Sequence, residues 1–94
     1  MDIVDFSKVN KHLKKLPSHI LTEFRIWVQT IETAGLRAMR IQKRYRDHLL
    51  KGNRKGQRAS CFGRSYRVIY EVHKSGEINI IKVEKVTNHD YRKK

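Results

Sequence analysis

The chain has 94 residues, which is enough for one domain over residues 1–94 and too few for two. It carries 22 Lys and Arg against 9 Asp and Glu, a net charge of +13, which is typical of proteins that bind nucleic acid or an acidic partner. One cysteine excludes an internal disulfide, and neither a signal peptide nor an apolar run of roughly 20 residues is present, so we expect a cytoplasmic protein without membrane contact.

The N-terminal residues predict a short edge strand followed by a helix. Residues 2–6 favour a strand, and Ser7 is a suitable N-cap for the helix. Pro17 then interrupts the helical pattern. The apolar residues of this first segment have helical spacing: Phe6, Val9, Leu13 and Leu16.

A second helix is predicted between Ser18, a suitable N-cap, and Gly35, a natural C-cap. Because the link between the two helices is short, they should form an antiparallel pair. Phe24 and Trp27 belong to the apolar stripe, which predicts core positions and not binding positions. The full stripe is Ile20, Phe24, Trp27, Val28 and Ile31.

The C-terminal half predicts strands. A short helical turn from Leu36 to Met39 and a basic turn at residues 51–56 precede three strands at 58–62, 66–73 and 78–86, and the tail is polar. The tight turns between these strands favour antiparallel pairing. We therefore expect an α+β fold in which two antiparallel helices pack on an antiparallel sheet of about four strands.

Basic residues gather on the predicted strands, so the concave face of the sheet is the expected anion site. Arg67 is the most informative of them, because a charged residue in mid-strand requires a partner. Glu71, on the same face, would make an ion pair with it, whereas a phosphate would match the planar guanidinium. The segment between His48 and Tyr70 has no acid and six basic residues: Lys51, Arg54, Lys55, Arg58, Arg64 and Arg67.

The polar tail contains His89, Asp90 and Tyr91, and both His and Tyr side chains can transfer protons. A metal-free ribonuclease needs such groups, together with cations that stabilise the phosphate during 2′-hydroxyl attack. A solvated terminus would have the same composition. The five histidines are not at zinc-ligand spacing, so we assign no metal and no cofactor.

Four segments together resemble the RelE/HigB toxins of type II toxin–antitoxin systems, in the RelE/ParE superfamily. The Tyr66–Tyr70 strand is the most specific of them, and the resemblance is strongest from His48 onward. The segments are Leu50-Lys51-Gly52, Gly56-Gln57-Arg58, Arg64-Ser65-Tyr66-Arg67-Val68-Ile69-Tyr70-Glu71 and Asn88-His89-Asp90-Tyr91.

The resemblance implies a toxin that enters the ribosomal A site and cleaves mRNA without metal. By position, Arg67 corresponds to the strand arginine of that family, Arg58 and Lys85 to further basic residues, and Tyr91 to the terminal aromatic, with His89 beside it. Ser60 stands where some members have a second lysine, and the tail spacing is shorter than in some members. Because of these two departures, His89 and Tyr91 both stay open as the general base. The implied partners are the ribosome, mRNA and a cognate antitoxin, often of the helix-turn-helix type.

Two other functions stay open at this stage. The same fold includes ParE-like toxins that act on DNA gyrase, and fold does not separate them from the nucleases. The chain would also fit a non-catalytic module that binds RNA or the ribosome. The basic strands and the His-Asp-Tyr ending favour the nuclease.

Overall fold

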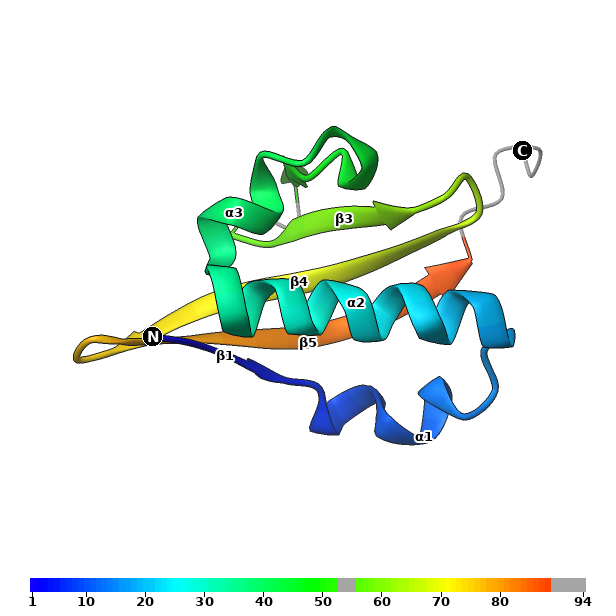
Figure 1. The fold of residues 1–94 in the computed structure, drawn as a ribbon, viewed down its shortest axis with the longest axis horizontal. Coiled ribbons are helices and arrows are strands. Elements are labelled where there is room, and N and C mark those ends of the chain that lie inside the picture. Colours follow the sequence, from blue (N-terminus) through cyan, green and yellow to red (C-terminus); the bar gives the residue numbers. More distant parts are fainter. Residues whose placement is uncertain (53–55, 89–94) are drawn as a thin grey trace.

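A computed structural model shows a mixed five-stranded sheet with helices against one face, in the described residues 1–52 and 56–88 (Figure 1). The strand order is β1-β5-β4-β3-β2. The strands are β1 Asp2–Asp5, β2 His48–Leu49, β3 Arg58–Phe62, β4 Tyr66–Ser75 and β5 Ile78–Asn88. The helices are the 3-10 turns η1 Ser7–Val9 and η2 Lys43–Tyr45 and the α-helices α1 Asn10–Leu13, α2 Ser18–Ala34 and α3 Leu36–Arg40.

The α+β class and the three C-terminal strands are confirmed, but the sheet is mixed and not antiparallel throughout. β3, β4 and β5 pair antiparallel, whereas β1 pairs parallel with β5 at one edge. No tight turn joins β1 to β5, because nearly the whole chain lies between them, so the sequence offered no signal for this pairing. At the other edge, the two-residue strand β2 is too short for alternation to reveal it.

The first helix is shorter than predicted. The expected helix begins with a 3-10 turn and continues for only four α-helical residues. The Ser7 side chain does not cap it. Asp5 Oδ1 instead accepts hydrogen bonds from the Ser7 amide at 3.0 Å and from Ser7 Oγ at 2.8 Å. These bonds fix the chain where it leaves β1.

The second helix, α2, matches the prediction closely and lies over the sheet, roughly along β4 and β5 (Figure 1). Ser18 is its first residue and not its cap, because the N-cap is Pro17, which has no side-chain acceptor. The Pro17 carbonyl accepts the first helical bonds. Gly35 ends the helix at φ 101°, a conformation that favours glycine. Phe24 and Trp27 are core residues as predicted, 2% and 0% exposed.

A β-bulge in β5 decides which face of the sheet Lys85 occupies. Val83 lies opposite Tyr70, whereas Lys85 lies opposite Ile69, so Glu84 is an extra residue between them. Without the bulge, strict alternation from Val83 would place Lys85 on the helix-covered face. The bulge places Lys85 on the opposite face and returns the next residue, Val86, to the core.

Candidate functional site

The sheet face opposite the helices carries the most informative cation, Arg67. Arg67 lies opposite Cys61 on β3 and Thr87 on β5. Its Nε is buried and has no hydrogen-bond partner among residues 1–52 and 56–88. A buried guanidinium nitrogen without a partner is costly. Within the described chain, this nitrogen is therefore a donor suited to an anionic ligand.

Glu71 does not form the ion pair that would have made Arg67 a structural residue. Its Oε2 accepts a hydrogen bond from Gln57 Nε2 at 2.8 Å, and its Oε1 lies 3.0 Å from His73 Nε2. The bond from Gln57, followed by contact with His73, holds the pKa of Glu71 below its usual value. Glu71 is therefore a carboxylate engaged elsewhere on the face.

Lys85 is the second cation of this face. It lies opposite Ile69, the neighbour of Arg67 on the same side of β4, and is therefore diagonal to Arg67 across the strand pair. Diagonal residues have Cβ atoms about 7–8 Å apart, within reach of two long basic side chains. Lys85 is exposed. Together the two residues form a cationic pair that could hold one phosphate group, and we call it the Arg67–Lys85 pair.

Arg58 lies on the other, helix-covered face, because it pairs with Tyr70. Its Nε donates to Asp47 Oδ1 at 2.7 Å, and its side chain is 25% exposed. The Asp47 side chain is fully buried. Asp47 Oδ2 also accepts hydrogen bonds from Ser60 Oγ and Tyr70 Oη, both at 2.6 Å. One carboxylate thus joins the segment before β2 to β3 and β4.

The Asp47 network also affects Tyr70 and involves Arg40. Burial, followed by the hydrogen bond to Asp47, raises the pKa of Tyr70 to about 12. Arg40 Nε lies 3.9 Å from Asp47 Oδ1. Asp47 is not among the residues predicted from the sequence, although a signal exists. It is the single acid between Glu32 and Glu71, within a strongly basic stretch, and such an isolated acid is a candidate for a buried ion pair.

The remaining predicted residues are dispersed or lie outside the described chain. Arg64 is exposed on the turn between β3 and β4, and Lys51 is exposed shortly after β2. Of the predicted residues, the strand register places Arg67 and Lys85 on one face of the sheet and Arg58 on the other. Four predicted residues lie outside the described ranges: Arg54, Lys55, His89 and Tyr91.

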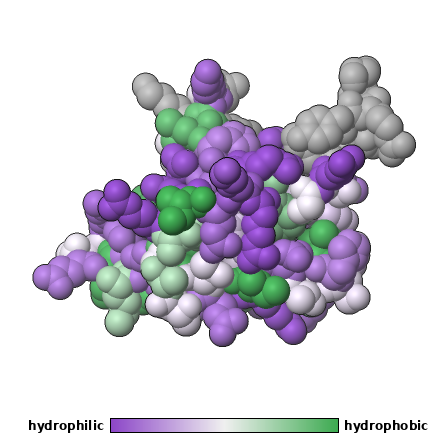
Figure 2. Space-filling view, turned by 45° about the horizontal axis from the view of Figure 1, so that its top comes forward, coloured by the Kyte–Doolittle hydropathy of each residue, from purple (hydrophilic) through white to green (hydrophobic). Residues whose placement is uncertain are grey.

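Hydrophilic residues cover much of the face seen in Figure 2, and separate hydrophobic patches lie among them. Among residues 1–52 and 56–88, no three His, Cys, Asp or Glu side chains form a group suited to a metal ion. No helix of this described part is long and apolar enough to cross a membrane.

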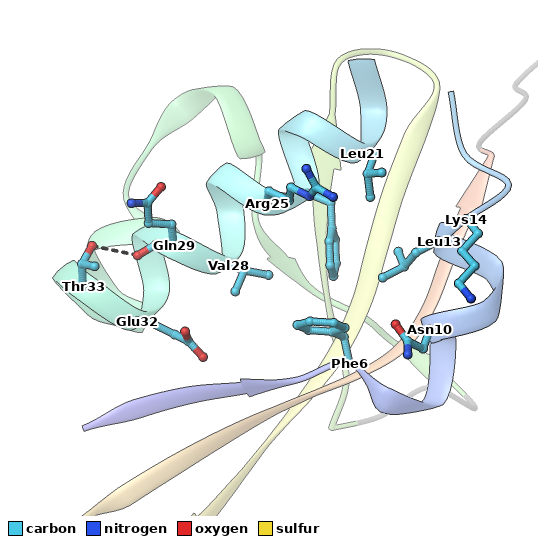
Figure 3. Close-up of a pocket in the computed structure, with 11 residues that line it drawn as sticks. Phe6, Asn10, Leu13, Lys14, Leu21, Arg25, Val28, Gln29, Glu32 and Thr33 are labelled. Carbon is cyan, nitrogen blue, oxygen red and sulfur yellow. Dashed lines mark hydrogen bonds between the residues drawn. The ribbon is translucent and has the colours of Figure 1, made fainter. Parts of the chain in front are cut away.

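A second surface feature is a groove of about 470 Å³ between α1 and α2 (Figure 3). Its walls are largely apolar, with Arg25 and Lys14 at the rim. Grooves of this kind accept apolar side chains of a partner protein. The apolar residues that line it are Phe6, Leu13, Leu21, Phe24 and Val28.

No protein-family model matches the sequence, and no curated protein matches it. Solved structures do match. A chain of the toxin–antitoxin complex RelBE2 from Mycobacterium tuberculosis aligns with a TM-score of 0.66 and 20% identity, over 93% of this chain and 96% of that one. A chain of the YoeB–YefM complex from Staphylococcus aureus aligns at 0.66 and 17%, over 96% and 99%.

YafQ from E. coli also aligns, with a TM-score of 0.63 and 17% identity, over 95% of this chain and 92% of YafQ. At such identities the likeness concerns the fold. It extends over the helices and the sheet together, since nearly the whole of each chain is covered. The chain therefore has the fold of the RelE/ParE-type toxins.

Proposed function

We propose that this protein is a toxin of a toxin–antitoxin system that cleaves mRNA in the ribosomal A site. The observation that carries the proposal is the Arg67–Lys85 pair, in which the buried Arg67 Nε has no hydrogen-bond partner among the described residues. A net charge of +13 gives the chain a strong attraction for RNA. The toxin fold supports the same conclusion, because its solved relatives include named toxins and toxin–antitoxin complexes.

The proposed reaction is metal-independent attack of a ribose 2′-hydroxyl on the adjacent phosphorus. A base removes the 2′-hydroxyl proton, the new O–P bond forms, and the bond from phosphorus to the 5′-oxygen breaks as an acid protonates that oxygen. The products are a 2′,3′-cyclic phosphate and a free 5′-hydroxyl. Arg67 and Lys85 would stabilise the charge on the pentacoordinate phosphorus. We propose His89 and Tyr91, outside the described residues, for proton transfer.

Other basic residues would bind the RNA backbone and not the reacting phosphate. We propose Arg64 and Lys51 for this role on the basis of their exposure, together with Arg54 and Lys55 outside the described ranges. Arg58 can contribute only through its terminal nitrogens, because its Nε is bonded to Asp47. Such contacts add salt-dependent affinity without sequence preference.

The proposed protein partner is a cognate antitoxin in the cytoplasm. YefM and DinJ are partners of that kind in complexes whose toxins resemble this chain. An acidic antitoxin would be attracted by the net charge. We place an apolar segment of it, rather than RNA, in the α1–α2 groove, because nucleic acid offers little apolar surface for those walls.

Mapping of mRNA 5′ ends tests the proposal in a reconstituted translation mixture, with free mRNA as the second condition. Cuts at A-site codons that need ribosomes would support it. Without cuts in either condition, the nuclease assignment is wrong, and a gyrase supercoiling assay then distinguishes a ParE-like toxin from a non-catalytic RNA- or ribosome-binding module.

A further inference from the structure

A separate pocket of about 310 Å³ lies beside the first turns of α2, between η2 and the β3–β4 turn. Its floor is apolar and includes Ile20, Tyr45 and Phe62, each no more than 4% exposed. No residue that lines it lines the α1–α2 groove. It is therefore a distinct concave site with a floor of buried apolar side chains.

Basic side chains surround the mouth of this pocket. Arg44, Arg64 and His19 line it, opposed by one carboxylate, Glu23. The Arg44 guanidinium lies 4.7 Å from the centroid of the Tyr45 ring, and its Nη2 donates to Tyr45 Oη at 2.9 Å. These two contacts hold Arg44 in place before any ligand binds, which lowers the entropic cost of binding.

The two walls of the pocket are also connected. Arg46 Nη2 donates to the Gly63 carbonyl at 3.2 Å, which joins the end of η2 to the β3–β4 turn. Arg64 follows Gly63 directly in that turn. The bond therefore fixes the position from which Arg64 extends toward the mouth.

We propose that this pocket binds one unpaired nucleotide of the RNA strand that lies on the Arg67–Lys85 pair, an inference that rests on the proposed function. The base would fill the pocket and stack on the Arg44 guanidinium, which lies over Tyr45, because the floor side chains are at most 4% exposed. Its phosphate would contact Arg64. Inorganic phosphate alone fits less well, because Glu23 repels it, whereas a base offers N–H donors to that carboxylate.

The position of the pocket favours RNA over an acidic peptide. Cys61 lines the pocket and lies directly opposite Arg67 in the β3–β4 register. Residues directly opposite in an antiparallel pair have Cα atoms about 4.5–5.5 Å apart. Arg67 lies on the face opposite the helices, whereas Phe62 in the pocket floor belongs to the helix-side core. Arg64 and Ser65, in the turn that joins the two strands, line the pocket and precede Arg67 by three and two residues. A strand whose reacting phosphate contacts Arg67 would therefore reach the pocket by passing around the β3–β4 turn.

Abasic substitution in a short RNA tests this assignment. The probe is a fluorescein-labelled 2′-O-methyl hexanucleotide, which cannot react by 2′-hydroxyl attack, and the readout is the Kd from anisotropy. We expect one abasic position to weaken binding by about tenfold, the usual contribution of one stacked base. Arg64→Ala should weaken binding of the intact probe about fivefold and reduce the abasic effect to below about twofold. Arg37→Ala, an exposed arginine on α3, is the control of equal charge.

Each result of the binding experiment either supports or overturns the pocket assignment. An equal response to abasic sites at all six positions, an equal loss in Arg64→Ala and Arg37→Ala, or no binding of the intact probe would overturn the pocket assignment. Cleavage on ribosomes is scored separately. A position-specific abasic effect without cleavage would support the pocket assignment and refute the nuclease assignment. Cleavage without that effect would refute the pocket assignment alone.

Discussion

Arg58 and Arg67 lie on opposite faces of the sheet, although each was predicted to contact RNA on the same face. Arg58 pairs with Tyr70 and bonds to the buried Asp47, whereas Arg67 pairs with Cys61 and has no described partner at Nε. Residues 58 and 61 are an odd number apart on β3, so alternation alone separates the two arginines. Their roles should differ accordingly, one in stability and one in chemistry.

Replacing Arg67 should abolish most activity and leave the fold intact. Arg67→Ala removes a charged donor from the phosphate and should lower the cleavage rate by about 10²–10³-fold. The matched control is Lys74→Ala, which removes an exposed cation from the same strand. Ribosome-dependent cleavage and a thermal melt measure the two properties. An inactive variant that is also unfolded, or a fully active one, contradicts the assignment.

Lys85 provides a test of the β-bulge. Lys85→Ala should lower cleavage by about tenfold, because an exposed cation contributes less than a partly buried one. Lys82→Ala, another exposed lysine of β5, should leave the rate within about twofold of wild type. Equal rates for the two variants would mean that the position created by the bulge has no role in the reaction.

Asp47 should matter for stability. Asp47→Asn leaves Arg58 without its counter-charge and weakens the bonds to Ser60 and Tyr70, so the free energy of unfolding should fall by about 2–4 kcal/mol. Urea denaturation measures the change. Glu77→Gln, in the exposed β4–β5 turn, is the neutralising control and should cost less than about 0.5 kcal/mol. A small effect at Asp47 would refute its structural role.

Local patterns predicted the α2 stripe, Gly35 and the three C-terminal strands, since helical spacing and tight turns are encoded by nearby residues. Pairings between distant residues were not accessible in this way. The parallel β1–β5 contact and the burial of Asp47 depend on segments that are far apart in the chain. The prediction that Arg67 lies in a strand is confirmed. Local sequence could not show that Glu71 makes no ion pair with Arg67, because this depends on Gln57 and His73, which contact the Glu71 carboxylate.

Alkaline pH should destabilise the protein through Tyr70. Its pKa is raised to about 12 from the ordinary phenol value of about 10, so the folded state retains the phenol proton where the unfolded state loses it. This contribution to stability is complete below pH 10 and is lost as the pH rises from 10 to 12. Tyr70→Phe should unfold more easily at neutral pH and show a flatter loss of stability over that range. Urea midpoints at pH 8 and pH 11 measure it, and parallel slopes would contradict the prediction.

The α1–α2 groove should bind the antitoxin and not RNA. Val28→Asp places a charge in the apolar wall of the groove, so the affinity for an antitoxin that neutralises the toxin in growth assays should fall by at least about tenfold. Ile26→Asp is the matched control, because Ile26 lies on the same helix, is 37% exposed and does not line the groove. Titration calorimetry measures binding, and ribosome-dependent cleavage should be unchanged in both variants. Equal affinities would place the antitoxin elsewhere on the surface. Lost cleavage in a folded Val28→Asp variant would instead assign the groove to RNA or the ribosome.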